Sequence, residues 1–208
     1  MLLKLTNLLL FISCLSIAQA NEIEWKEILN EDNIKVYQAI GEFDILPFKA
    51  ETVLNESKES ILKVLKDMKN KSKWSPKLDY VKVHKKISEN EIIFSEFYKT
   101  PWPSTDREFL LIGKETHLSP KKIKITAKSL NDPSLMNEDY IQADVIKLDL
   151  LLTELSKDKT KIEFEFYGDL KGWLPIWLVN LIQKKWPMRF LQGLRNETAL
   201  YTLQARNN

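Results

Sequence analysis

The chain has 208 residues, 44% of them hydrophobic and 29% charged, and its formal net charge at pH 7 is +2. This composition is that of a globular domain, and it excludes a disordered, fibrous or disulfide-dense chain. The balanced charge provides no basic footprint, so no nucleic-acid partner is expected. We expect one domain, acting as a monomer, with a sizeable core and no cofactor.

Residues 1–20 have the pattern of a secretory signal peptide, with a basic residue, a short apolar stretch and a small-x-small triplet that ends at Ala20. We expect cleavage after Ala20, export to a bacterial periplasm, and a mature domain of residues 21–208. An uncleaved anchor helix and lipidation at Cys14 are the alternatives. Cys14 is the only cysteine, so the mature chain has no thiol for a disulfide or a metal site.

The first part of the mature chain is predicted to mix helices and strands. Trp25, Ile28 and Leu29 have the spacing of one helical face, whereas the apolar residues that follow alternate with polar ones. Ser57 is a candidate N-cap for a second helix. The expected elements are a helix at 22–30, strands at 34–37 and 48–53, and a helix from 57 to about 70.

Most of the middle of the chain has the two-residue period of half-buried strands, whereas 92–98 is a β-prone run and 109–112 is apolar throughout, as a strand covered on both faces would be. The expected strands lie at residues 81–84, 92–98, 109–112, 122–127, 146–150 and 161–166. Most connections are too short for a parallel crossover, so these strands must pair antiparallel. The loop 131–139 is longer, and it is either an element that moves or an ordinary surface loop. His84 and His117 have polar neighbours, so we expect surface roles for them and no metal site.

The last part of the chain, from Leu174 to about Leu203, has a helical period that includes Ile182, Trp186 and Phe190. At 1.5 Å per residue this helix spans roughly 40 Å, which is long enough to cross a sheet. Pro187 lies within it, and we expect a kink about one turn earlier. The predicted fold class is therefore α+β, a curved antiparallel sheet wrapped around a long C-terminal helix. The periodicity leaves open whether the space between them is filled or hollow.

Two segments resemble the START domain family, the lipid-transfer family named for the steroidogenic acute regulatory protein. Residues 101–109, PWPSTDREF, are similar to the P-x-P-x-x-x-R-D-[FY] segment of these domains. Residues 172–180, GWLPIWLVN, are similar to the G-x-[IL]-P-x-x-[LI]-[IV]-N opening of the family's C-terminal helix. Trp74 resembles the tryptophan before the family's first central strand. The order and spacing of these features agree from about Trp25 to Arg195.

The resemblance implies the helix-grip fold, an interior cavity of lipid size and, in most members, no catalysis. We therefore expect non-enzymatic binding of a single hydrophobic lipid-like molecule, with transfer as a further role and transient contact with a membrane surface. Members that bind choline head groups have Arg and Asp where this chain has Lys71 and Ser75, so phosphatidylcholine is not expected. Sterol, fatty acid, other phospholipids and isoprenoids stay open as ligands.

The predicted ligand-binding residues combine motif residues with apolar positions of the expected sheet and helix. They are Trp74, Tyr98, Trp102, Arg107, Leu111, Phe164, Trp173, Trp177 and Leu181. Arg107 either orients a ligand head group, since guanidinium binds phosphate or carboxylate through two bonds, or forms a structural ion pair with Asp106 or Glu108. The tryptophans either line the cavity or pack in an ordinary core.

Two other functions stay open from the sequence. Helix-grip proteins include polyketide aromatases and cyclases, and an enzyme of that type would place two ionisable groups within hydrogen-bond reach inside the cavity. The residues available for such chemistry are Arg107, Glu108, Glu96 and Tyr98. The other alternative is an interaction protein with a filled core and no ligand, which an interior volume of a few hundred Å³ would exclude.

Overall fold

The computed structural model describes residues 23–41 and 47–207, and the predicted signal peptide lies outside the described residues. The strands are β1 (Glu24–Glu31), β2 (Ile34–Ile40), β3 (Phe48–Leu54), β4 (Leu78–Ser88), β5 (Glu91–Tyr98), β6 (Arg107–Ser119), β7 (Lys122–Ser129), β8 (Ile141–Gln142), β9 (Asp144–Ser156) and β10 (Lys159–Asp169). The helices are α1 (Lys58–Lys66), the 3₁₀ turn η1 (Lys71–Lys73) and α2 (Ile176–Asn207).

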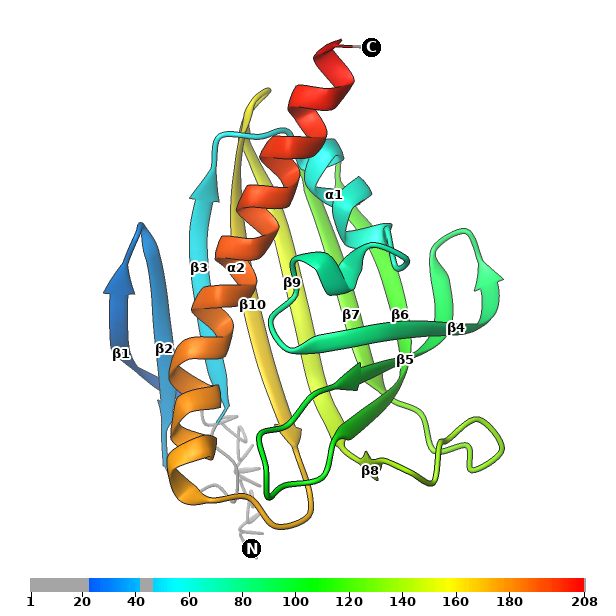
Figure 1. The fold of residues 1–208 in the computed structure, drawn as a ribbon. Helices are drawn as coiled ribbons and strands as arrows, with labels where there is room; N and C mark the ends of the chain where they lie inside the picture. Colours follow the sequence, from blue (N-terminus) through cyan, green and yellow to red (C-terminus); the bar gives the residue numbers. More distant parts are fainter. Residues whose placement is uncertain (1–22, 42–46, 208) are drawn as a thin grey trace, which may run out of the picture.

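The strands form one sheet in the order β1-β2-β3-β10-β9-β7-β6-β5-β4. Every neighbouring pair along this path is antiparallel, and β8 adds a short parallel pair at β6. Figure 1 shows α2 running along the sheet in front of β2, β3 and β10, with β4 and β5 curling round toward α1 and η1. The predicted α+β helix-grip architecture is therefore confirmed.

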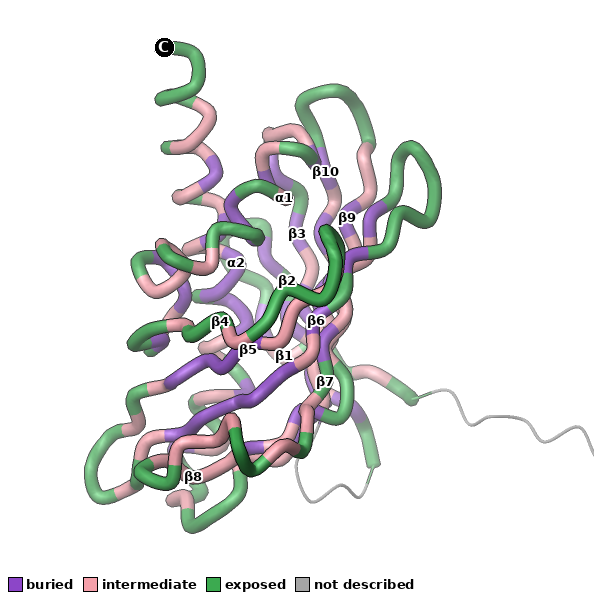
Figure 2. Tube along the Cα trace, turned by 90° about the vertical axis from the view of Figure 1, so that its right-hand side faces the viewer, coloured by how far each residue is buried: buried purple, intermediate pink, exposed green. Residues whose placement is uncertain are grey.

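The core lies between the concave face of the sheet and the two helices. Strand alternation places Ile162 and Phe164 on this face, where both are almost fully buried, while Lys161 and Glu163 point outward. From α2, Leu191 and Leu194 pack into the same cluster with no exposed surface. Figure 2 shows the buried residues along the strands and on α2, with exposed residues at the hairpin ends. Removal of these apolar side chains from water is the main force that holds α2 on the sheet.

The segment predicted as a helix at 22–30 is the strand β1, so that prediction is wrong. A register shift between Glu27 and Leu29 makes Ile28 an extra residue in the pairing with β2. This bulge moves Leu29 to the inner face, where it is buried, whereas Trp25 lies under the Lys49 ammonium, 4.0 Å from the ring centre. The bulge therefore breaks the two-residue alternation and leaves a spacing that is typical of a helix.

Both helices begin near the predicted positions. The Ser57 side chain accepts a hydrogen bond from the backbone N–H of Ser60, which confirms it as the N-cap of α1. The helix ends at Lys66, earlier than predicted, because Asp67 leaves the helical conformation. The second helix continues through Pro187 to Asn207 as one element. Among the described residues, neither helix combines the length and the hydropathy that a membrane span requires.

Candidate functional site

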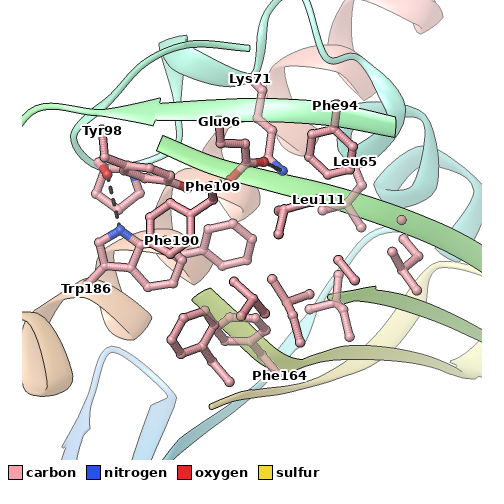
Figure 3. A pocket seen from close by; sticks show the side chains of 18 of the residues that line it. Leu65, Lys71, Phe94, Glu96, Tyr98, Phe109, Leu111, Phe164, Trp186 and Phe190 are labelled. Carbon is pink, nitrogen blue, oxygen red and sulfur yellow. Dashed lines mark hydrogen bonds and ion pairs between the residues drawn. The ribbon is translucent and has the colours of Figure 1, made fainter. Parts of the chain in front are cut away.

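A cavity of about 560 Å³ lies between α2 and the concave face of the sheet. The side chains that form its walls are largely apolar and come from both layers. Figure 3 shows Phe94, Phe109 and Leu111 from β5 and β6 on one side, with Phe164 of β10 and Phe190 of α2 facing them. A volume of this size excludes the filled-core alternative, because pockets of a few hundred Å³ hold small molecules.

Aromatic rings of α2 and β10 make the wall opposite β5 rigid. The Trp186 and Phe190 rings stack at 5.2 Å, and Phe190 also stacks on Phe164 at 5.2 Å. The indole N–H of Trp186 donates to the carbonyl oxygen of Pro76 at 3.2 Å, which fixes the ring plane. Because one α2 residue bonds the segment before β4, the helix and the far side of the cavity are held at a fixed separation.

A buried polar cluster of Lys71, Glu96 and Tyr98 lies within the largely apolar lining. The Lys71 ammonium of η1 forms an ion pair with Glu96 of β5, and the Tyr98 hydroxyl donates to the other Glu96 oxygen at 2.8 Å. Glu96 and Tyr98 are two residues apart on one strand, so both point to the concave face, as Figure 3 shows. Glu96 is 5% exposed. An ion pair this deep requires its partners to offset the cost of leaving water.

The charges and protonation of this cluster determine which of its atoms can form a hydrogen bond with a ligand. Burial raises the pKa of Tyr98 well above its ordinary value, and the negative charge of Glu96 raises it further. Tyr98 therefore stays protonated and donates to Glu96. An ammonium has three N–H donors, and Glu96 is the only hydrogen-bond acceptor that Lys71 reaches within 23–41 and 47–207. A ligand hydroxyl could accept from Lys71 while donating to Glu96.

Arg107 lies at the end of the cavity where α2 begins, and it bonds backbone carbonyls rather than a carboxylate. Its guanidinium donates to the carbonyls of Lys171 at 3.0 Å, Trp173 at 3.3 Å and Leu170 at 3.4 Å, and also to that of Thr105. The ion pair predicted with Asp106 or Glu108 does not form among the described residues. Burial lowers the Arg107 pKa, and the four carbonyls offset part of the cost of that burial.

The structure brings part of the predicted set together. The residues of that set that line the cavity are Tyr98, Arg107, Leu111, Phe164 and Leu181. Trp74 instead lies in the core, with its ring 5.3 Å from that of Phe190. Trp102 is 91% exposed, and Trp173 and Trp177 are also exposed, beside the start of α2.

Several residues that form the site were not predicted to bind a ligand. Lys71 was not among the predicted ligand-binding residues, and Glu96 was a candidate only for catalysis. Trp186 and Phe190 were assigned to the helical stripe and not to the cavity wall. The sequence does contain a signal for Glu96. It lies two residues from Phe94 and from Tyr98 on β5, so its side chain points to the same inner face as theirs.

The histidines lie away from the polar cluster. His84 Nε2 is 2.8 Å from the Ser95 hydroxyl, and His117 Nε2 is 2.7 Å from Glu115. In the part of the chain that the structure describes, no group of His, Cys, Asp and Glu could hold a metal ion.

Comparison with known proteins supports the motif resemblance. The model of the START domain family matches residues 14–202. The chain belongs to the START domain family. The mitochondrial steroidogenic acute regulatory protein of Rattus norvegicus is 25% identical over 191 residues, which cover 84% of this chain and 64% of that protein. This START domain thus spans less than two thirds of that relative.

Solved structures show the same fold. Human STARD10 superposes with a TM-score of 0.79 at 17% identity, covering 88% of this START domain and 76% of that chain. A STAR-related lipid transfer protein fragment from Xanthomonas axonopodis superposes with a TM-score of 0.74 at 19% identity. The superposition covers 84% of this START domain and 98% of that chain. The Zhui aromatase/cyclase of a Streptomyces species is more distant, with a TM-score of 0.53 at 9% identity. The superposition covers 74% of this START domain and 93% of that chain.

Proposed function

We propose that this START domain binds one lipid-like molecule in the cavity, without catalysis, and passes it between membranes. The observation that supports the proposal is a cavity of about 560 Å³ with largely apolar walls, into which the buried cluster of Lys71, Glu96 and Tyr98 points. Burial of an apolar ligand surface there stabilises the complex by ~25 cal/mol per Å². Related proteins named for lipid transfer share the fold, which is consistent with this function.

The polar cluster supports a ligand with a hydrogen-bonding end. Lys71 and Glu96 together carry no net charge, so a phosphate or a carboxylate would have to compete with Glu96 for the ammonium. A hydroxyl or carbonyl end can bond Lys71 without breaking that pair. We therefore propose that the ligand is an amphiphile with a neutral polar end near Lys71 and Glu96 and an apolar body against the Trp186 wall.

A cavity-filling substitution tests the proposal. Leu111 lines the cavity, whereas Ile112, the next residue on β6, points to the opposite face of the sheet. Titration with fluorescent sterol, fatty acid and isoprenoid probes should show saturable binding of at least one probe by the wild type. Leu111→Trp should weaken that binding at least tenfold, which corresponds to about 1.4 kcal/mol, and Ile112→Trp should not. Equal binding by both variants would place the ligand elsewhere.

We also propose that the end of the molecule near the start of α2 contacts the membrane. Trp102 is 91% exposed, Ile176 78% and Trp177 58%, and water-exposed tryptophans favour the membrane interface. Lys77 and Lys185 line the cavity and can attract anionic lipid head groups. Trp102→Ala with Trp177→Ala should reduce co-sedimentation with mixed phosphatidylcholine and phosphatidylglycerol vesicles. Trp25→Ala, on the outer face of β1, should leave co-sedimentation unchanged. Equal losses in both variants would contradict membrane contact at the start of α2.

A second candidate function is acid–base catalysis of the aromatase/cyclase type. It is favoured by the contact between Tyr98 and Glu96, which are ionisable groups within hydrogen-bond reach in the cavity. Against it, Tyr98 is held protonated and both Glu96 oxygens have partners. A synthetic poly-β-keto thioester separates the two functions. Ring closure with loss of water that disappears in Glu96→Gln would support the enzyme, and an unchanged substrate would support binding alone.

We propose that residues 1–20 direct export and are removed, so that the domain of residues 21–208 acts in the periplasm as a monomer. The support is the sequence pattern of that segment. Mass spectrometry of the protein recovered from its own cells should give a chain that begins at Asn21. A chain that retains residues 1–20 would contradict cleavage.

A further inference from the structure

Two consecutive residues of β6 hold two different loops at the same end of the sheet. Arg107 faces the cavity and bonds the carbonyls of the linker 170–173, which precedes α2. Glu108 faces the other side and is fully buried. One of its carboxylate oxygens accepts from the backbone N–H of Asn137 and from the Gln142 side chain, both at 2.7 Å. Hydrogen bonds to a carboxylate are stronger than those between neutral groups.

The segment that Glu108 holds is bound to β6 along its length. The N–H of Ile141 donates to the Asp106 carbonyl at 3.0 Å, and the N–H of Ala143 donates to the Glu108 carbonyl at 2.9 Å. This pairing makes Ile141–Gln142 the short parallel strand β8. The loop 131–139, which the sequence left as either a moving element or an ordinary surface loop, is therefore tied to the outer side of the sheet by a buried carboxylate.

The linker before α2 packs on this segment. A methyl group added at Gly172 would lie 2.6 Å from the Ile141 Cδ1 atom and 3.5 Å from an Arg107 nitrogen. Gly172 and Lys171 both have positive φ angles, 65° and 49°, so the linker makes a sharp bend at this point. The inner side of the linker thus lies against the Arg107 guanidinium and the Ile141 side chain, while residues 171–173 stay exposed on the other side. Its position determines where Leu174 and Leu178 of the cavity lining begin.

We propose that Glu108 is a positioning residue for the end of the cavity at the start of α2, and that it acts from the outer face of the sheet through Ile141. Its carboxylate fixes residues 137–142, Ile141 supports the linker at Gly172, and the linker sets the first turn of α2 over the cavity. Loss of the carboxylate frees the linker although no residue of the cavity is changed. The consequence for lipid exchange rests on the proposed function, but the effect on the linker does not.

Hydrogen–deuterium exchange of the full chain tests this without any ligand. Glu108→Leu removes both acceptor bonds, and Gln142→Leu removes one of them and serves if Glu108→Leu does not fold. Glu108→Gln is the conservative variant, because its amide oxygen can still accept from both donors. Thr160→Val is the matched control, since it removes the buried 2.8 Å bond to the Glu56 carbonyl far from the linker.

The expected result is about tenfold faster exchange of the first-turn amides of α2, Leu178 and Val179, whose N–H groups donate to the Pro175 carbonyl, in Glu108→Leu and Gln142→Leu, with near wild-type rates in Glu108→Gln and Thr160→Val. The proposal is overturned if exchange rises only in residues 137–142 while these two amides keep their protection. It is also overturned if Thr160→Val raises their exchange as much, because the effect would then report general loss of stability. Both outcomes can be read without a lipid, so failure of the protein to bind lipid would not change what this experiment says about Glu108.

Discussion

The Lys71–Glu96 ion pair is the residue-scale feature on which the site depends. The two side chains are 14% and 7% exposed, so removal of one charge leaves the other buried without its counter-ion. Lys71→Met should lower the free energy of unfolding by roughly 3–5 kcal/mol. The double variant Lys71→Met, Glu96→Leu should recover most of this loss, because no unpaired charge remains. Urea unfolding measures both, and a loss below ~1 kcal/mol in the single variant would mean that water reaches the pair.

Gly172 is the other residue with a specific conformational requirement. Its φ of 65° is strained for any residue with a side chain, and a Cβ atom there would also have to displace the Ile141 Cδ1 methyl group. Gly172→Ala should destabilise the fold by about 1–3 kcal/mol. Lys171→Gly is the matched variant, because its positive φ is unfavourable for lysine and its carbonyl bond to Arg107 is retained. We expect unchanged or higher stability for Lys171→Gly, and equal losses in urea for both variants would contradict this account of the linker.

At the scale of elements, α2 packs closely against Trp74, the residue after η1, and this contact limits how far the helix can approach that segment. A Cβ atom on Gly193 would collide with the carbonyl oxygen of Trp74. Alanine in place of glycine inside a helix usually adds about 1 kcal/mol of stability. Here we expect the opposite, a loss of about 1–3 kcal/mol, because backbone atoms must move apart.

The control for this prediction is Asn196→Ala, an exposed position of the same helix. It should raise the thermal midpoint slightly, whereas Gly193→Ala should lower it. A higher midpoint for Gly193→Ala would show that α2 can shift without cost. The cavity walls formed by Trp186 and Phe190 would then be less fixed than the structure indicates.

Most elements could be predicted because their apolar residues follow one period. β10 keeps a strict alternation from Lys161 to Phe166, and α2 keeps a helical stripe over its whole length. β1 could not be predicted in this way. Its bulge at Ile28 changes the phase of the strand, and a bulge is set by pairing with β2, which is a long-range contact.

The site could be predicted only in part, for a related reason. Strand phase places Phe164 on the cavity, because it alternates with Glu163 and Glu165, whereas Leu111 lies in a run that is apolar at every position, so periodicity alone did not select its face. Lys71 and Glu96 meet because η1 lies over β5, and the sequence contains no signal for that contact. Trp102 and Trp173 were chosen from family motifs, which indicate membership but not the direction of a side chain, and both are exposed.

At the scale of the whole molecule, tyrosines with raised pKa values predict alkaline unfolding. Burial raises the pKa of Tyr98 well above its ordinary value, and partial burial together with the hydrogen bond to Glu51 raises that of the half-buried Tyr37 to about 12. The native state therefore keeps protons that the unfolded chain loses near pH ~10, so the stability that these tyrosines contribute is constant below that pH and falls above it. Tyr98→Phe should show a shallower fall in urea midpoint between about pH 9 and 11. A fall as steep as that of the wild type would mean that Tyr98 is not responsible.

The proposed function depends on a lipid that occupies the hollow between α2 and the sheet. Native mass spectrometry of the protein purified from its own cells, followed by extraction, tests it most directly. We predict that the protein carries one lipid-like molecule per chain, and that Leu111→Trp prepared in the same way carries much less than Ile112→Trp. Protein that is free of lipid, and that takes up none from an extract of its own membranes, would contradict the account.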